Sequence, residues 1–279
     1  MANTHPLQVT LDRAMQLEDY IRFQLGPVSA SDWVTSTQLV HPDSLPKWVN
    51  KIQDNLGTES KVIVASSLLQ RYQWQIIVAG ISCYLLDQRV PDLSPDNLRL
   101  QLDEEEGVRA LALTHGTFTA LATDPAANHA DVHTVASQEA LREVLRQQLE
   151  GHFGWVIDQL CTHLGCKPRG LWLTVADRCA ATFIWLMQEL EVATPVDQIE
   201  HEINGVLRVA GSPLNHPKIG VFTLTYKDRS QAFLDRASCC YWYREKDGDY
   251  CSTCPSRSQD DRNSRLLEYM SEEYTNATS

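Results

Sequence analysis

Apolar positions recur at helical spacing along most of the chain, which predicts a mainly helical protein. The segment 60–88 is long and strongly apolar, so we expect a buried helix that ends at Val90-Pro91-Asp92. The segment 43–55 begins with Asp43 and Ser44, either of which suits the N-cap position of a helix. The predicted helices cover 9–24, 43–55, 60–88, 137–164, about 170–190, about 195–208 and a polar tail at 257–275.

Shorter stretches alternate between apolar and polar residues, as β-strands do. Residues 98–103 read LRLQLD and residues 108–113 read VRALAL, with Glu104-Glu105-Glu106-Gly107 between them, which predicts a β-hairpin. Residues 118–122 are expected to add a third strand, and residues 221–226 alternate in the same way. We therefore predict an α+β fold that is mainly helical, with a small antiparallel sheet and a C-terminal cysteine loop.

The polar residues 124–133 are the best candidate for a boundary within the chain. They separate an N-terminal helical region with a β-hairpin, 1–130, from a helical region, 131–279, that ends in the cysteine segment at about 236–256. The two regions either fold separately or form one unit.

Composition narrows the class of protein. The chain has 279 residues, a formal net charge of −12 and 43% hydrophobic residues, so it can bury a core and is expected to bind no nucleic acid. The N-terminus lacks the features of a secretory signal, and no apolar stretch reaches the ~18 residues that a membrane helix needs. We expect a cytoplasmic protein without an integral membrane segment, whose eight cysteines stay reduced.

Four of these cysteines form the pattern Cys239-Cys240-x10-Cys251-x2-Cys254. Four thiolates this close in sequence can hold one inorganic centre, either an iron–sulfur cluster or a structural zinc ion. Asp247-Gly248 predicts a turn in the ten-residue gap, which would bring Cys251 back toward Cys240.

The adjacent pair Cys239-Cys240 favours the cluster. Zinc knuckles usually separate their ligands by two to four residues, whereas neighbouring Cα atoms are ~3.8 Å apart and their side chains tend to point apart. A [2Fe–2S] cluster has two irons and takes two pairs of ligands, so it accommodates adjacent cysteines more readily than a single ion does. Zinc and four unrelated thiols remain the alternatives.

Other polar side chains have less specific signals. Arg236 and Arg244 flank the first cysteine pair, and they are the candidates for tuning a cluster or contacting a substrate. Cys161 and Cys166 have the C-x4-C spacing of plant-type ferredoxins, but the third cysteine of that motif is absent, so they are interpreted as structural thiols. Core or helix-surface roles are expected for Cys83, Cys179, His152 and His163.

The cysteine segment resembles that of the ferric siderophore reductases of the FhuF type, a family that carries a [2Fe–2S] cluster on a Cys-Cys-x10-Cys-x2-Cys motif. The resemblance includes the four cysteines, the gap, and the residues Tyr241-Trp-Tyr-Arg244 and Cys254-Pro255. Weaker similarity at Val90–Ser94 and at Arg169-Gly-Leu-Trp172 extends it over residues 60–256 or so.

The resemblance implies that Cys239, Cys240, Cys251 and Cys254 ligate the cluster. It further implies release of iron in the cytoplasm by one-electron reduction of a ferric siderophore, most often a hydroxamate. A separate ferredoxin or flavoprotein is the expected electron donor, because the chain has no GxGxxG fingerprint for a dinucleotide. Two other functions fit the same cysteines: a zinc-knuckle binding or scaffold protein, and an Fe–S sensor of iron or redox state.

Overall fold

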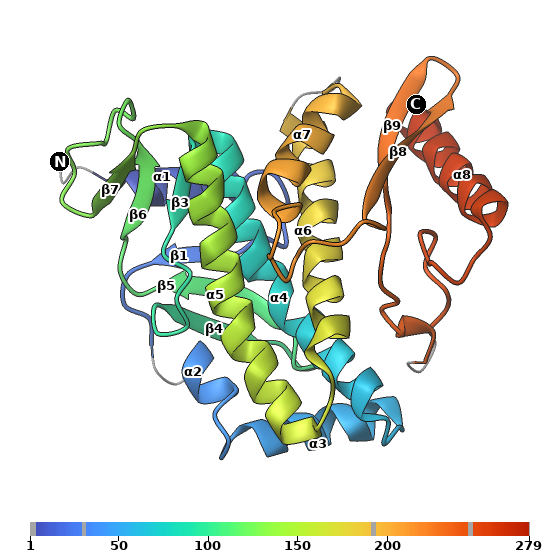
Figure 1. Cartoon of the computed structure of the whole chain (residues 1–279), viewed down its shortest axis with the longest axis horizontal. Helices are drawn as coiled ribbons and strands as arrows, with labels where there is room; N and C mark the ends of the chain where they lie inside the picture. The colour runs from blue at the N-terminus through green and yellow to red at the C-terminus, as the bar shows by residue number, and fades with distance from the viewer. Residues whose placement is uncertain (1–3, 30–31, 191–193, 245–247, 279) are drawn as a thin grey trace.

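Three long helices form the centre of the computed structural model, which describes residues 4–29, 32–190, 194–244 and 248–278. They are α4 (Lys61–Asp87), α5 (Gln138–Leu164) and α6 (Pro168–Leu190), and α4 packs against both of the others (Figure 1). Helix α4 is buried along most of its length, as its apolar sequence predicts. Ser137 caps α5 by accepting a hydrogen bond from the N–H of Ala140.

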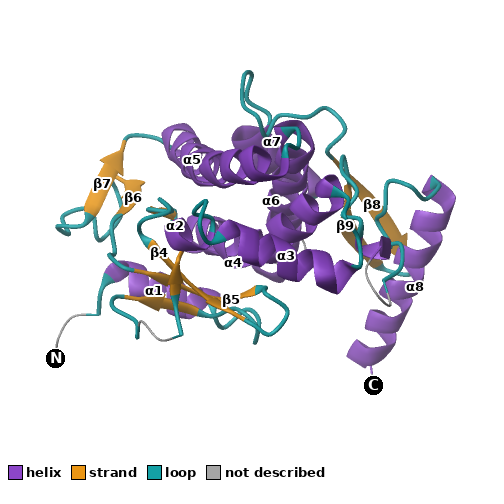
Figure 2. Cartoon of the chain, turned by 90° about the horizontal axis from the view of Figure 1, so that it is seen from below, coloured by secondary structure: helices purple, strands orange, loops and turns teal. Residues whose placement is uncertain are grey.

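Two small sheets lie on one side of these helices (Figures 1 and 2). The predicted hairpin is present, since β4 (Leu98–Leu102) pairs with β5 (Val108–Leu113) in antiparallel register. Strand β5 also pairs in parallel with β1, and in the second sheet β6 pairs in parallel with β7. The remaining strand bounds are β1 (Phe23–Leu25), β2 (Val34–Thr35), β3 (Arg89–Pro91), β6 (Phe118–Leu121) and β7 (Val132–Val135). The fold is α+β as predicted, but these two sheets are mixed rather than purely antiparallel.

The first predicted helix is too long. Helix α1 covers only Pro6–Ala14, and residues 23–25 form β1 instead. The reason is tertiary, because β1 gains backbone hydrogen bonds to β5 that a continued helix would forgo. Further on, α3 (Leu45–Leu56) follows Ser44, but the Ser44 side chain makes no capping hydrogen bond. The short helix α2 (Ser36–Leu39) lies just before it.

A third layer covers the opposite side of α6 from the sheets (Figure 2). Strands β8 (Gly220–Tyr226) and β9 (Arg229–Asp235) form an antiparallel hairpin, of which only β8 was predicted from the sequence. The polar tail is helical, as predicted, and forms α8 (Gln259–Thr278), which packs against the hairpin through Leu266 and Met270. Helix α7 (Val196–Leu207) packs between α5, α6 and β8.

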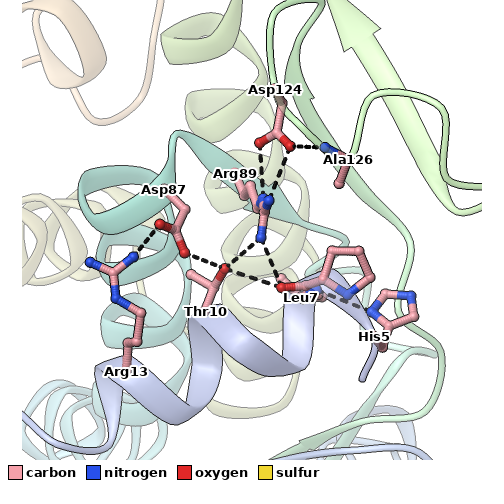
Figure 3. Close-up of polar contacts among 9 residues, drawn as sticks. His5, Leu7, Thr10, Arg13, Asp87, Arg89, Asp124 and Ala126 are labelled. Atoms are coloured by element: carbon pink, nitrogen blue, oxygen red, sulfur yellow. Dashed lines mark hydrogen bonds and ion pairs between the residues drawn. The ribbon is translucent and has the colours of Figure 1, made fainter. Parts of the chain in front are cut away.

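A polar network joins the N-terminal helix to the central layer (Figure 3). Arg89 of β3 donates to both carboxylate oxygens of Asp124, at 2.9 and 3.0 Å, and to the hydroxyl of Thr10 on α1. Asp87, the last residue of α4, accepts from Thr10 at 2.7 Å and pairs with Arg13. Such paired, hydrogen-bonded charges can be buried at little net cost, so they fix how α1 docks on α4.

The apolar core runs across the predicted boundary at 130/131. Leu68 and Leu93 from the first region and Leu145 and Val175 from the second belong to one cluster of buried side chains. Strand β7 lies partly within the 124–133 segment and pairs with β6 from the first region. None of the helices in the described ranges is long and apolar enough to cross a membrane.

Candidate metal centre

The four-cysteine segment follows β9 and folds back against the central helices. Asp177 of α6 accepts hydrogen bonds from the backbone N–H groups of Ala237 and Ser238, at 2.9 and 2.8 Å, and from the Ser238 hydroxyl. Gln70 of α4 donates to the backbone carbonyl of Cys240 at 2.7 Å. Two long helices therefore hold the chain on either side of the first cysteine pair.

Backbone geometry separates the directions of the two adjacent cysteines. Tyr241 adopts a left-handed conformation with φ of 59°, so the chain turns directly after Cys240. The N–H of Tyr241 donates to the sulfur of Cys239 at 3.4 Å, while Cys240 lines a cavity on the other side. Hydrogen bonds from backbone N–H to thiolate sulfur are typical of iron–sulfur sites, where they adjust the reduction potential.

The second cysteine pair sits in a tight turn. The N–H of Cys254 donates to the carbonyl of Cys251 at 3.0 Å, and the N–H of Arg257 donates to the carbonyl of Cys254 at 3.0 Å. The guanidinium of Arg257 also donates to the carbonyls of Cys251 and Tyr250 and pairs with Asp261 of α8. Cys254 is only 1% exposed, so this turn is part of the packed structure rather than a loose tail.

The thiols form two pairs rather than one tetrahedral group. The Cys251 thiol is the largest influence on the pKa of Cys240, and the Cys254 thiol contributes to the raised pKa of Cys239. Within the described ranges, no three of these sulfurs lie within 4.8 Å of one another. A tetrahedral ion with Zn–S bonds of ~2.3 Å would bring all four sulfurs closer than that. Two separate pairs fit the two irons of a [2Fe–2S] cluster.

A cation lies beside one pair. Arg236 donates to the sulfur of Cys251 at 3.2 Å and lies 3.7 Å from the Asp177 carboxylate. Burial opposes its charge, but the Cys251 and Cys240 sulfurs and Asp177 raise the pKa of Arg236 above its ordinary value. The Cys251 thiol and Arg236 lower the pKa of Cys240, whereas the Cys240 thiol and burial raise the pKa of Cys251. The site is thus prepared for a thiolate, the form that binds iron.

The second candidate arginine is placed differently. Arg244 is exposed on the short 3-10 turn Trp242–Arg244, with its guanidinium 5.3 Å from the centre of the Tyr243 ring. Tyr243 in turn stacks on Tyr250 at 4.4 Å. Of the two arginines that the sequence indicated, the structure brings only Arg236 to the thiols. The predicted turn at Asp247-Gly248 includes Asp247, which lies outside the described residues.

A cavity of about 640 Å³ opens against the Cys240–Cys251 pair. Helices α4 and α6 form one wall, and β9 and α8 form the opposite wall. Its lining combines an aromatic surface with charges of both signs, including Arg178, Trp185, Glu189, Tyr269 and Glu273. The cavity is therefore assembled from segments that are far apart in the sequence.

Two polar side chains of this cavity were not predicted from the sequence. Arg178 lies with its guanidinium 5.2 Å from the Trp74 ring, and burial and the nearby Arg236 lower its pKa. Gln73 is 1% exposed, and neither atom of its amide has a hydrogen-bond partner among the described residues. For Gln73, the sequence signal was the run of polar residues that interrupts the apolar segment 60–88. The unpaired amide of Gln73 is available to hydrogen-bond a ligand in the cavity.

The other cysteines and histidines that the sequence singled out lie apart from this site. Cys83 and Cys179 are fully buried in the core, as predicted. His152 is buried between the Tyr72 hydroxyl and the Leu93 carbonyl, whereas His163 is exposed. Cys161 and Cys166 have their sulfurs 3.0 Å apart at the end of α5.

A second group of possible ligands, His5, His129 and Asp131, lies near the N-terminus. Nδ1 of His5 accepts the N–H of Leu7 at 3.1 Å and so caps α1 (Figure 3). The neutral ring therefore carries its proton on Nε2, which faces Asp131 at 3.1 Å. That proton occupies the position a metal would need, so we interpret this group as a helix cap.

Comparison with known families gives two matches. A family described as ferric iron reductase FhuF-like transporter matches residues 66–197, which include most of α4 and all of α5 and α6. A second family, described as the FhuF 2Fe-2S C-terminal domain, matches residues 236–255, which include all four cysteines and Arg236. No curated protein matches the chain.

Proposed function

The chain belongs to the FhuF-like ferric iron reductases and has their C-terminal [2Fe–2S] domain, and on this premise we propose that it is a ferric siderophore reductase. We propose Cys239, Cys240, Cys251 and Cys254 as the cluster ligands and a ferric hydroxamate as the substrate. The observation that carries the proposal is the cavity whose wall includes Cys240 and Cys251.

The chemistry needs binding and proximity rather than bond cleavage in an organic substrate. Hard oxygen donors hold Fe(III) far more tightly than Fe(II), so one electron makes the iron complex labile. A [2Fe–2S] cluster held by the four cysteines would supply that electron. At about 640 Å³ the cavity has the size of a small-molecule site, so it can hold a ferric complex directly beside two cluster ligands.

The residues of the cavity suit a hydroxamate complex. Arg178 and Gln73 can donate hydrogen bonds to its oxygen atoms, since neither has an acidic partner in the described structure. Trp185 offers an apolar surface to the organic backbone of the ligand. Glu189 and Glu273 line the same cavity and suit a ligand that carries a positive charge.

The proposal also requires a source of electrons and a compartment in which the reaction takes place. The chain has no dinucleotide fingerprint, so we assign electron delivery to a separate ferredoxin or flavoprotein in the cytoplasm. Trp242 is 47% exposed next to the cysteine pair and offers such a donor an aromatic contact. The zinc-scaffold function is not favoured, because no three of the four sulfurs lie within 4.8 Å of one another among the described residues.

A substitution that fills the cavity tests the proposal. Ala181 lines it, so Ala181→Phe should lower the rate of ferric hydroxamate reduction at least ~10-fold while the cluster spectrum stays unchanged. Reduction of hexacyanoferrate(III), a small one-electron acceptor, should be nearly unaffected. Met187→Phe is the matched control, because Met187 lies on the same helix but outside this cavity. Equal rates of hydroxamate reduction in Ala181→Phe and wild type would refute this substrate site.

A further inference from the structure

The end of helix α5 brings two thiols into contact. Gly165 ends the helix in a left-handed conformation with φ of 68°, and its N–H donates to the carbonyl of Cys161 at 2.8 Å. In helix ends of this type, the residue after the glycine commonly makes an apolar contact with the residue four positions before the glycine. Here these two positions are Cys166 and Cys161, and their sulfurs are 3.0 Å apart.

The pair differs from the structural cysteines of the core. Cys83 and Cys179 are completely buried, whereas Cys161 and Cys166 are partly exposed to solvent. An oxidant can therefore reach the pair but not the core thiols. A disulfide bond of ~2.05 Å needs only a small approach of two sulfurs that the helix end already holds together.

The surroundings of Cys161 assign different roles to the two thiols. Burial, the Cys166 thiol and Asp158 raise the pKa of Cys161, so it stays protonated and is a poor nucleophile toward an oxidant. We therefore assign the first attack on the oxidant to Cys166 and the resolution of the product to Cys161.

We propose that Cys161 and Cys166 form a reversible disulfide when the protein meets a hydroperoxide. The Cys166 thiolate attacks the terminal peroxide oxygen, which forms a sulfenic acid as the O–O bond breaks and the remaining alkoxide or hydroxide takes up a proton. Cys161 then attacks that sulfur, which forms the S–S bond and releases water. In sum, two thiols and one hydroperoxide give one disulfide, one water and one alcohol, or two waters from hydrogen peroxide.

The location connects this pair to the proposed metal centre without making it a ligand. Cys166 lines a cavity of about 230 Å³ whose other residues include Cys239, Ser238 and Tyr241. The pair therefore lies on the Cys239 side of the cysteine loop, while the substrate cavity lies on the Cys240 side. The inference rests on the helix end alone, so it stands whether or not the protein reduces siderophores.

Mass spectrometry of the full-length, cluster-loaded protein tests the proposal. The protein is treated with hydrogen peroxide, alkylated with N-ethylmaleimide and digested. We expect the peptide with Cys161 and Cys166 to lose two hydrogens and resist alkylation, and dithiothreitol should restore both thiols. Cys83 and Cys179 serve as internal controls, which should stay unoxidised.

Two variants test the assigned roles. In Cys161→Ser, peroxide should leave a sulfenic acid on Cys166 that dimedone labels, whereas Cys166→Ser should give little label on Cys161. The proposal is overturned if both thiols remain free after peroxide or if Cys166 pairs with Cys239.

Discussion

Arg236 lies within hydrogen-bonding distance of one thiol, beside a second, and against the Asp177 carboxylate. Its charge therefore acts on the electron-rich centre through a short, partly desolvated path, where electrostatic effects are largest. A cation in this position stabilises the more negative, reduced state of a cluster. The residue was one of two arginines indicated by the sequence, and only the fold distinguishes it from Arg244.

Removing this charge should make the cluster harder to reduce. We expect Arg236→Gln to lower the reduction potential by roughly tens of millivolts, where ~59 mV is a tenfold change in a one-electron equilibrium. Arg236→Lys should restore most of the shift, because it keeps the charge. A potentiometric titration followed by electron paramagnetic resonance measures the potential. Arg244→Gln is the control, and a shift there as large as in Arg236→Gln would contradict the assigned position.

Single residues show where sequence reasoning succeeds and where it stops. The cysteines are close in sequence and share a spacing that the chemistry requires, so their grouping could be predicted. Arg178 and Gln73 meet the cysteine loop only because α4 and α6 pack side by side. No local pattern carries that information, and for this reason these two lining residues were not predicted.

Among the contacts between helices, the side chain of His152 on α5 fixes the packing of that helix against α4. Its ring hydrogen-bonds the Tyr72 hydroxyl at 2.8 Å and the Leu93 carbonyl at 2.7 Å, and it is 1% exposed. Burial lowers the pKa of His152 to about 4, although the Leu93 carbonyl opposes the shift. The folded protein therefore excludes a proton that the unfolded chain binds below pH ~6.5.

This shift makes stability depend on pH. The pKa is lower in the folded state, so stability is complete above pH ~6.5 and falls as the pH drops toward 4. Between pH 7 and pH 5 we expect His152 to cost roughly 2 kcal/mol of unfolding free energy. Urea unfolding at both pH values measures the loss. In His152→Gln the loss of unfolding free energy between the two pH values should be smaller. His163 is exposed on the same helix, so His163→Gln should lose as much as wild type. An equal loss in wild type and both variants would show that His152 is not the cause.

Helix α8 closes one wall of the cavity, so its docking should affect substrate binding. Met270 is buried against the β8–β9 hairpin, and Tyr269 and Glu273 of the same helix line the cavity. Met270→Ala should cost about 2 kcal/mol and raise the KM for a ferric hydroxamate, with the cluster spectrum unchanged. Steady-state kinetics measures the change, with the exposed Glu268→Ala as control. An unaltered KM in a destabilised Met270→Ala variant would show that α8 is not part of the site.

The elements were predicted best where the pattern is long. Helices α4, α5 and α6 could be located because their apolar periodicity runs over many residues. Strands β1 and β9 were missed, since short strands depend on partners distant in the chain. The parallel pairings of β1 with β5 and of β6 with β7 were missed for the same reason, because no local turn signal specifies a parallel pair.

At the scale of the whole molecule, one core supports both walls of the cavity. The apolar cluster includes residues on both sides of 130/131, and the Arg89 network joins α1 to the same body. We therefore expect one cooperative unfolding transition. Circular dichroism and tryptophan fluorescence should give the same midpoint in urea. Two separated transitions would instead support independent domains at 1–130 and 131–279.

We propose that this protein passes one electron from its cluster to the iron of a ferric siderophore. Anaerobic stopped-flow spectroscopy can follow that step, when dithionite-reduced protein is mixed with ferrioxamine B in the presence of a ferrous chelator. We expect fast reoxidation of the cluster, with one Fe(II) captured for each electron lost. A reduced cluster that persists beside the ferric complex, or a purified protein that holds zinc and no cluster spectrum, would contradict it.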